Sequence, residues 1–120
     1  MRVNPGRLSV TRAFGNIQAK DPNLRGNPEC IISRPEIFVK TLDDTCDFIF
    51  IASDGVYDRL QDVNIASSVL AATGGCKGSV HDACGDAARR VLADAMRMRT
   101  SDNISSIVIC LTGLEKKIPS

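Results

Sequence analysis

Residues 47–53, Asp-Phe-Ile-Phe-Ile-Ala-Ser, form an almost unbroken apolar run that is rich in β-branched and aromatic side chains. A short run of this composition is typical of a β-strand that is buried on both faces. Asp54 and Gly55 follow directly, and the glycine allows the backbone to turn sharply. The stretch therefore predicts a core strand of a layered α/β protein with a carboxylate at its end.

The sequence after this strand predicts two helices and a returning strand. Asp62 is expected to cap the first helix, which ends at Gly74-Gly75. Its apolar stripe consists of Ile65, Ala66, Val69 and Leu70. The second helix is expected over about residues 79–98, because apolar residues recur there at steps of three and four. These residues are Val80, Cys84, Ala87, Val91, Ala95 and Met98. The last strand is expected over residues 104–111, which gives the order β-αα-β.

The sequence before the strand predicts little regular structure. Residues 1–28 are interpreted as turns around one short element at Leu8–Phe14. Two extended stretches, residues 30–33 and 36–42, are separated by Arg34-Pro35, and the proline argues against one continuous strand. Asp43 and Asp44 are expected to form a turn.

Length and charge limit the classes of protein to consider. A chain of 120 residues predicts one domain. The formal net charge of +1 gives no electrostatic field for nucleic acid or for an anionic membrane, so neither is an expected partner. Because the sequence shows no signal-peptide pattern and no apolar run of the ~20 residues that cross a bilayer, a cytoplasmic or nuclear location is expected.

The five cysteines are odd in number, irregularly spaced and without a C-x-x-C pair. They therefore indicate neither a disulfide framework nor a zinc cluster. Cys84 and Cys110 fall on apolar faces of their predicted elements, where a thiol behaves as a small hydrophobic group. We expect reduced and buried cysteines.

Two carboxylates lie at the ends of the predicted strands. Asp54 follows the first strand, and Asp102 comes shortly before the second. If the strands are antiparallel neighbours, the two side chains meet at one edge of the sheet, where like charges repel unless a cation lies between them. Oxygen ligands without His or Cys suit Mg²⁺ or Mn²⁺. From spacing alone, each aspartate could equally be a turn or capping residue without metal.

Three segments resemble signature stretches of the type 2C metal-dependent protein serine/threonine phosphatases, in the family's order. They are Gly6-Arg-Leu-Ser-Val-Thr-Arg-Ala-Phe-Gly-Asn16, Phe48-Ile-Phe-Ile-Ala-Ser-Asp-Gly-Val-Tyr-Asp58 and Ser101-Asp-Asn-Ile-Ser-Ser-Ile-Val-Ile109. In the third segment, the residue that many members have between Ser and Asp is absent. The resemblance implies an α+β fold, the four-layer α/β/β/α sandwich, of which residues 1–120 would be the C-terminal half within a single catalytic domain.

The resemblance also implies a site and a reaction. Asp54 and Asp102 would be ligands of a binuclear Mg²⁺ or Mn²⁺ centre. Supporting roles would fall to Gly55 and Asn103 in shaping the site, to Asp58 in orienting the turn, and to Arg12 in holding its loop. The implied reaction is hydrolysis of phosphoserine or phosphothreonine in phosphorylated protein substrates, by a water activated between two ions.

The family's bridging Asp-Gly ligands have no counterpart, because no D-G-H-G-like stretch occurs in the chain. We therefore expect the isolated chain to be inactive and, with strands lacking part of their cover, to self-associate. The alternative is a catalytically silent half-domain that acts as an interaction module.

Three other sequence patterns do not match the structural context that their chemistry requires. The C-x₅-R spacing of Cys84 and Arg90 lies inside a helix rather than in a phosphate-binding loop. Residues 74–79 lack the G-K-[ST] order of a phosphate-binding loop. His81, which a Ser-His-Asp hydrolase would need as its base, is expected on the exposed face of its helix.

Overall fold

The computed structural model describes residue 3 and residues 8–118. The chain comprises two compact units, Met1–Lys40 (unit 1) and Thr41–Ser120 (unit 2), and each is described by itself. The described part of the chain contains helices and a small antiparallel sheet, which agrees with the predicted α+β class. The assignment of residues 1–120 to a single domain stays a prediction.

The described residues of unit 1 include one short α-helix, α1 (Ile17–Lys20), and a 3₁₀-helix, η1 (Pro22–Leu24). The predicted element at residues 8–14 is wrong, because only isolated bridges occur there, such as the parallel bridge between Arg12 and Ile32. A proline in η1 and left-handed backbone at Arg25 (φ 62°) keep the turns tight. The part of unit 1 that the structure describes is therefore mostly irregular, as the sequence before the core strand suggested.

Residues 33–42 contain neither helix nor strand, and the turn that follows forms as predicted. The Thr45 N–H donates to Asp43 Oδ1 over 2.9 Å, and the Cys46 N–H donates to the Asp43 carbonyl over 3.0 Å. This aspartate side chain thereby mimics a turn of backbone and leads the chain into the sheet.

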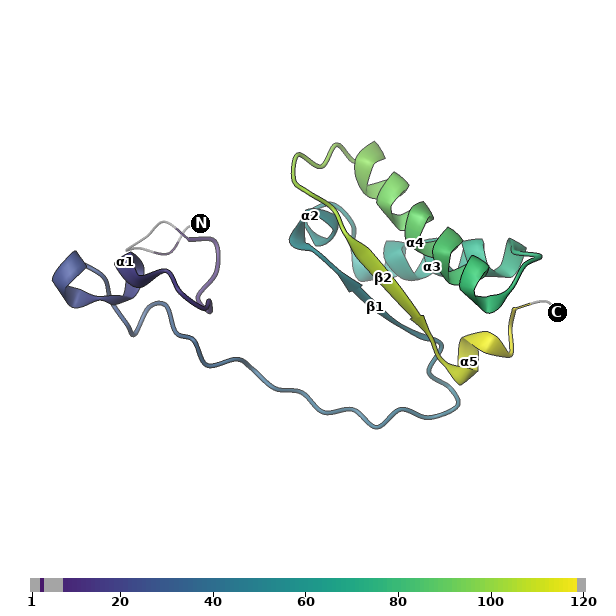
Figure 1. The fold of residues 1–120 in the computed structure, drawn as a ribbon, viewed down its shortest axis with the longest axis horizontal. Coiled ribbons are helices and arrows are strands. Elements are labelled where there is room, and N and C mark those ends of the chain that lie inside the picture. The colour runs from purple at the N-terminus through teal and green to yellow at the C-terminus, as the bar shows by residue number, and fades with distance from the viewer. Residues whose placement is uncertain (1–2, 4–7, 119–120) are drawn as a thin grey trace. The chain divides into compact units, whose positions relative to one another are not determined.

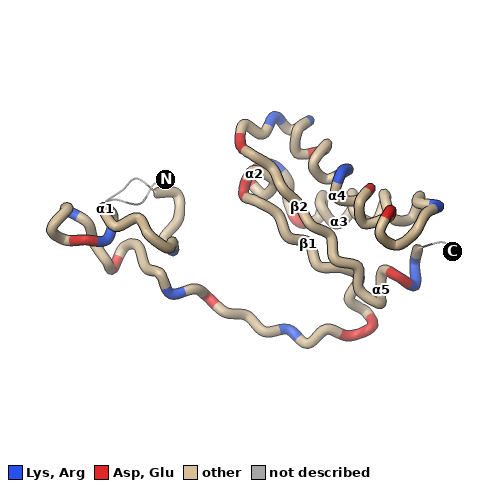
Figure 2. Tube along the Cα trace, in the orientation of Figure 1, with Lys and Arg blue, Asp and Glu red and all other residues tan. Residues whose placement is uncertain are grey.

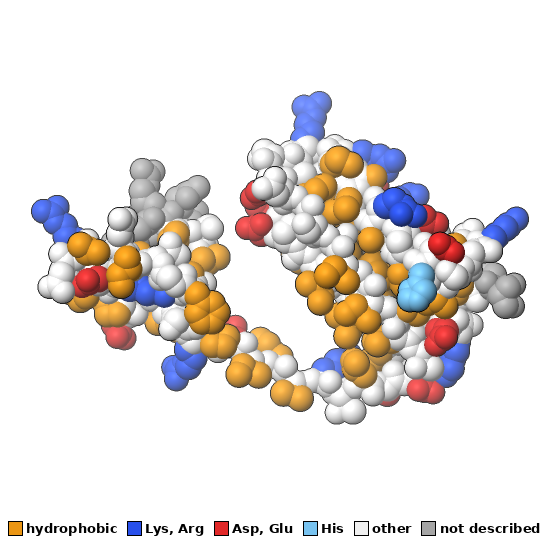
Figure 3. All heavy atoms as spheres, viewed as in Figure 1, with side chains coloured by type: hydrophobic (Ala, Val, Ile, Leu, Met, Phe, Trp, Pro, Cys, Tyr) orange, Lys and Arg blue, Asp and Glu red, His pale blue; other side chains and the backbone are white. Residues whose placement is uncertain are grey.

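The sheet of unit 2 pairs β1 (Phe48–Ala52) with β2 (Ser106–Cys110) in antiparallel register, with Phe50 opposite Val108 (Figure 1). Both strands lie within the predicted runs. Their predicted burial on both faces is wrong, because exposure alternates along each strand. The inner residues pack on the helices, whereas the outer face is a block of exposed isoleucines, 49, 51, 107 and 109. In Figure 3 hydrophobic side chains gather over this sheet.

Two helices, α3 (Asp62–Gly75) and α4 (Val80–Arg97), cover the inner face of the sheet. Helix α4 begins with a reciprocal capping box, in which Ser79 Oγ accepts from the Asp82 N–H and the Asp82 carboxylate accepts from the Ser79 N–H. The prediction that Asp62 caps α3 is wrong: Gln61 holds the cap position, without a side-chain bond, and Asp62 is the first helical residue. The glycine pair ends α3 as predicted.

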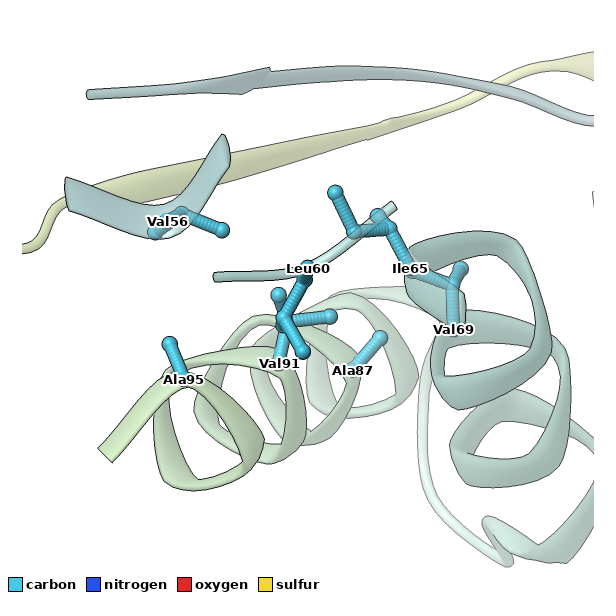
Figure 4. Packing of buried hydrophobic residues seen from close by; sticks show 7 residues of the cluster. All are labelled: Val56, Leu60, Ile65, Val69, Ala87, Val91 and Ala95. Carbon is cyan, nitrogen blue, oxygen red and sulfur yellow. The ribbon is translucent and has the colours of Figure 1, made fainter. Parts of the chain in front are cut away.

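The core of unit 2 lies between the two helices and the inner face of the sheet (Figure 4). Its buried residues are Val56, Leu60, Ile65, Val69, Ala87, Val91 and Ala95. On α4, Ala83 rather than Cys84 belongs to the buried face. Met98 caps the helix and is 56% exposed. The prediction that Cys84 and Met98 lie on the buried face is therefore wrong. Leu70, predicted to face the core, is 41% exposed. Small residues on α4 allow the helix to approach the sheet closely.

Charged residues of both signs are interspersed along α4 (Figure 2). Arg89 pairs with Asp86, and Arg90 and Arg97 both pair with Asp94. His81 lies on the same exposed surface, which agrees with its predicted solvation. Among the residues that the structure describes, no helix has the length and apolar character needed to cross a membrane. A last short helix, α5 (Thr112–Glu115), follows β2 and was not predicted.

Candidate metal centre

Antiparallel pairing places the end of β1 beside the start of β2, which is the condition under which the sequence brings the two carboxylates to one edge. Ala52 pairs with Ser106, and the Ser53 N–H donates to the Ser105 carbonyl over 3.0 Å, which extends the ladder by one step. Beyond this step, Asp54 follows on the β1 side, and residues 102–104 precede on the β2 side. The two predicted carboxylate positions therefore flank the same edge of the sheet.

The Ser53 hydroxyl ties the two sides of this edge together. Its Oγ donates to the carbonyl of Asn103 over 3.1 Å and accepts from the Ser105 N–H, also over 3.1 Å. One side chain thus satisfies a donor and an acceptor of the opposite segment, where the regular ladder has ended. The backbone on both sides of the candidate site is held in a fixed register.

Gly55 lies directly against the Asp102–Asn103 backbone. A β-carbon at position 55 would come within 2.5 Å of the Asn103 carbonyl oxygen and within 3.2 Å of the Asp102 Cβ. Only glycine permits this approach, which is the close-contact role of glycine rather than a conformational one. Thr100 adds a second connection, because its Oγ1 donates to the Gly55 carbonyl over 2.9 Å.

Asp54 is the first residue of a single-turn helix, α2 (Asp54–Tyr57), which the sequence did not predict as a helix. The fully buried Val56 anchors this turn to the core, while the Asp54 side chain faces solvent. Asp102 is exposed as well, and its Oδ1 accepts from the Asn103 N–H over 2.7 Å. Both carboxylates therefore stand on rigid backbone with their outer oxygens accessible.

Two predicted supporting residues remain, Asp58 and Arg12. Asp58 contributes a backbone hydrogen bond, and Arg12 lies in unit 1. The Asp58 N–H donates to the Asp54 carbonyl over 2.8 Å and closes the turn that begins with the carboxylate. Arg12 belongs to unit 1, where its guanidinium pairs with Glu36 over 2.7 Å. The role of Arg12 in holding its loop stays a prediction.

Sequence reasoning missed Ser53 and Thr100, whose hydroxyls fasten the two segments to each other. The available signal was their position, since each hydroxyl residue lies within two residues of a candidate carboxylate. Short hydroxyl side chains commonly bond to nearby backbone groups. Their partners lie about fifty residues away in the chain, so only the sheet register identifies them.

The donor set suits a hard cation but is small. Among the described residues, no group of three or more His, Cys, Asp or Glu side chains is placed to hold a metal ion. Mg²⁺ is usually bound through one or two carboxylates and keeps several waters, so two aspartates fit part of such a shell. Asp54 and Asp102 therefore fit a partial site for an oxygen-preferring ion.

Sequence comparisons show which known proteins this chain is similar to. The family sequence model described as Protein phosphatase 2C matches residues 1–104. Probable protein phosphatase 2C 2 of Oryza sativa subsp. japonica is 38% identical over 88% of this chain and 26% of its own length. Probable protein phosphatase 2C 13 of Arabidopsis thaliana is 32% identical over 91% of the chain and 27% of its own length. Protein phosphatase ppm-1.A of Caenorhabditis elegans is 28% identical over 91% and 22%, respectively.

The chain thus spans about a quarter of the length of the curated relatives that it matches. The family match covers the first two signature segments completely and reaches the Asp102–Asn103 pair of the third. The contact of Gly55 with that pair is the geometry that joins these distant segments. This chain belongs to the protein phosphatase 2C family.

Proposed function

We propose that this chain forms part of a metal-dependent protein serine/threonine phosphatase, in which Asp54 and Asp102 are ligands of a binuclear Mg²⁺ or Mn²⁺ centre. The observation that carries the proposal is the packing of Gly55 against the Asp102–Asn103 backbone, which sets the two carboxylate segments side by side at one sheet edge. Membership of the protein phosphatase 2C family supports hydrolysis of phosphoserine and phosphothreonine in protein substrates.

In this proposal the chain's own residues prepare the site before any ion binds. Asp54 and Asp102 supply negative charge at a place where a cation relieves their repulsion. Ser53 and Thr100 hold the backbone on which the carboxylates stand, which lowers the cost of ordering them on binding. When bound, two divalent ions would lower the pKa of a water and orient it for attack on phosphorus.

Three of the four supporting residues act through backbone geometry, and Arg12 acts through an ion pair. Gly55 and Asn103 keep the two segments in contact, and Asp58 closes the turn after Asp54. Arg12 pairs with Glu36 and would hold the loop of the first signature segment. None of these four is assigned a contact with the reacting phosphate.

We also assign the chain to the C-terminal half of a single four-layer α/β/β/α domain. The exposed outer face of the sheet supports this assignment, since isoleucines at 49, 51, 107 and 109 are what a second packed sheet would cover. Stacked sheets pack about 10 Å apart through such apolar faces. Residues 1–120 would then be one part of a larger layered core.

Metal binding tests the site without relying on activity. Mn²⁺ is titrated by calorimetry into the wild-type chain, Asp54→Ala, Asp102→Ala and the matched control Asp86→Ala, whose carboxylate pairs with Arg89 on the outer face of α4. We expect weak binding by the wild type and the control, because two carboxylates compensate little of the cost of dehydrating the ion. Binding should vanish in the two site variants. Equal binding by all four proteins would remove these residues from the site.

In this proposal, phosphatase activity requires the N-terminal half of the catalytic domain, which carries the family's bridging Asp-Gly ligands. We expect the isolated chain to show no hydrolysis of a phosphothreonine peptide above a metal-only background. A chimaera that joins the N-terminal part of the rice relative to this chain should show Mn²⁺-dependent turnover, and Asp54→Ala or Asp102→Ala should abolish most of it. A chimaera that folds, as judged by circular dichroism and cooperative unfolding, yet stays inactive would instead favour a silent interaction module.

A further inference from the structure

A small hollow of unit 2 is lined by residues of β1, α2 and α3. Its volume is about 300 Å³, and its lining residues are Phe48, Phe50, Tyr57, Asp62, Ile65 and Ala66. Ile65 belongs to the buried core, whereas Tyr57 is 44% exposed and Asp62 is exposed. The hollow therefore extends from the core to solvent. Its volume is at the lower end of the range for ligand sites, about 300–1,000 Å³, which suits one long side chain.

Three of the six lining residues are aromatic. The rings of Phe50 and Tyr57 meet edge to face, with their centroids 6.2 Å apart and their planes at 79°. This geometry is favourable for a pair of aromatic rings, and it fixes Tyr57 in the wall of the hollow. Aromatic side chains accept the apolar stem of a lysine or an arginine, and their rings attract its positive charge.

Asp62 is the one charged residue of the lining. Within the described ranges 3 and 8–118, its carboxylate takes part in no hydrogen bond and no ion pair. As the first residue of α3 it faces the positive end of the helix dipole, which offsets about half of one charge. Residues 54–62 contain three aspartates and one arginine, so the surroundings of the hollow remain negative.

We propose that this hollow binds a basic side chain, arginine in particular, of the phosphoprotein substrate. The apolar stem packs against the aromatic wall, and the guanidinium pairs with the Asp62 carboxylate. Arginine suits the hollow better than lysine, because its planar guanidinium stacks on aromatic rings and is less strongly hydrated. The role of the hollow in substrate choice rests on the proposed function, whereas the binding of a basic side chain does not.

Tyr57 links the hollow to the candidate metal centre. It lies three residues after Asp54 in the single turn of α2, which the bond from the Asp58 N–H to the Asp54 carbonyl closes over 2.8 Å. Side chains three residues apart on a helix have Cβ atoms about 5–6 Å apart. In an extended peptide, side chains on the same side are two residues, or about 6.6 Å, apart. A peptide with its phosphothreonine at the metal centre therefore reaches the hollow with the residue two positions away.

The fluorescence of the wild-type chain tests the hollow directly. Tyr57 is the only tyrosine, and the chain has no tryptophan, so its emission reports on this place alone. A blocked Gly-Arg-Gly peptide is titrated at low salt with a metal chelator, beside its citrulline and norleucine analogues. We expect a saturable change with the arginine peptide and about fivefold weaker binding of the neutral analogues, the upper range for an exposed ion pair. Equal binding of all three peptides would overturn the proposal.

Variants locate the charge that is responsible. Asp62→Asn should bind the arginine peptide about fivefold more weakly than the wild type, because the ion pair is lost. Asp86→Asn, on the outer face of α4, should bind it as the wild type does. Asp54→Asn should also keep the response, which separates the hollow from the candidate metal centre. Loss of the response in Asp54→Asn with no effect in Asp62→Asn would show that the peptide binds elsewhere.

The chimaera with the rice relative tests the role in substrate choice. We expect kcat/KM to be about fivefold higher for a phosphothreonine peptide with arginine two residues away than for its citrulline analogue. Asp62→Asn should remove this preference and leave hydrolysis of the citrulline peptide unchanged, and Asp86→Asn should keep the preference. A preference that survives in Asp62→Asn would refute the role of the hollow. A chimaera inactive on every peptide would count against the proposed function instead, and the fluorescence titration would still decide whether the hollow binds arginine.

Discussion

The Cα of Gly55 and the carbonyl oxygen of Asn103 are so close that a β-carbon at position 55 would lie 2.5 Å from that oxygen. Atoms this near leave no room for any side chain at position 55. Because Gly55 follows Asp54 and Asn103 follows Asp102, the contact fixes the separation of the two carboxylate segments through backbone alone. The candidate site is therefore set by the sheet register and by the lack of one β-carbon.

Replacing this glycine should destabilise the protein. Gly55→Ala forces the backbone of residues 102–104 to move, and overpacking of this kind costs about 1–3 kcal/mol of unfolding free energy. Gly74→Ala is the matched control, since no atom lies within 4 Å of a β-carbon there and alanine favours the helix by about 1 kcal/mol. Urea unfolding of both variants measures the difference. A Gly55→Ala protein as stable as the wild type would contradict the close contact.

Truncating the centre of the core should cost more than truncating its surface. Val91 on α4 is fully buried, and Val91→Ala removes two carbons from the cluster, which predicts a loss of about 2 kcal/mol. Val63 on α3 is 64% exposed, so Val63→Ala should change stability by less than about 0.5 kcal/mol. Denaturant midpoints with equal slopes report both values. Equal losses in the two variants would mean that α4 does not face the core as described.

The hydrogen bond between Ser68 on α3 and Asp94 on α4 should make the stability of the protein depend on pH. The Ser68 hydroxyl donates to the Asp94 carboxylate over 2.7 Å and lowers the pKa of that carboxyl below its ordinary value of 3.8. The ion pairs with Arg90 and Arg97 lower the pKa further, against the effect of burial. A lowered pKa in the folded state means that this stabilisation is present above the unfolded pKa and is lost as pH falls through the folded value.

Ser68→Ala should therefore cost about 1–2 kcal/mol near neutral pH, because the hydrogen bond is to a charged group. The cost should shrink as pH falls through the folded-state pKa of Asp94, because the stabilisation by the charged carboxylate is lost there. Ser67→Ala is the control, since the Ser67 hydroxyl donates to the carbonyl of Val63 over 2.8 Å on the exposed face of the same helix. Its effect should not vary with pH. A pH-independent loss in Ser68→Ala would exclude the bond to Asp94 as its cause.

The outer face of the sheet should drive self-association of the isolated chain. Ile51 and Ile107 pair across the strands and are 51% and 57% exposed, in a block of four isoleucines. The double variant Ile51→Thr/Ile107→Thr keeps β-branched residues in the strands and removes apolar surface. Sedimentation at rising concentration should show association in the wild type and a shift toward monomer in the variant. Val63→Thr, on the exposed side of α3, should behave like the wild type, and a wild type that stays monomeric throughout would refute the prediction.

Local pattern alone determined most elements of unit 2. The apolar run at 47–53, the period of α4 and the glycine pair that ends α3 each specify an element within a few residues, because side-chain periodicity and chain stiffness act over short distances. The same pattern placed Asp54 and Asp102 at strand ends. The resemblance of three segments to the type 2C phosphatases identified the family that the sequence comparisons then showed.

Only the tertiary structure decided which surfaces are covered and which distant groups meet. An apolar run does not reveal whether a second layer is present, so the exposure of the outer isoleucines could not be foreseen from residues 47–53. The hydrogen bonds of Ser53 to Asn103 and of Thr100 to Gly55 join residues about fifty positions apart. Such contacts depend on strand register and helix docking, which arise from the packing of the whole unit and have no local signal in the sequence.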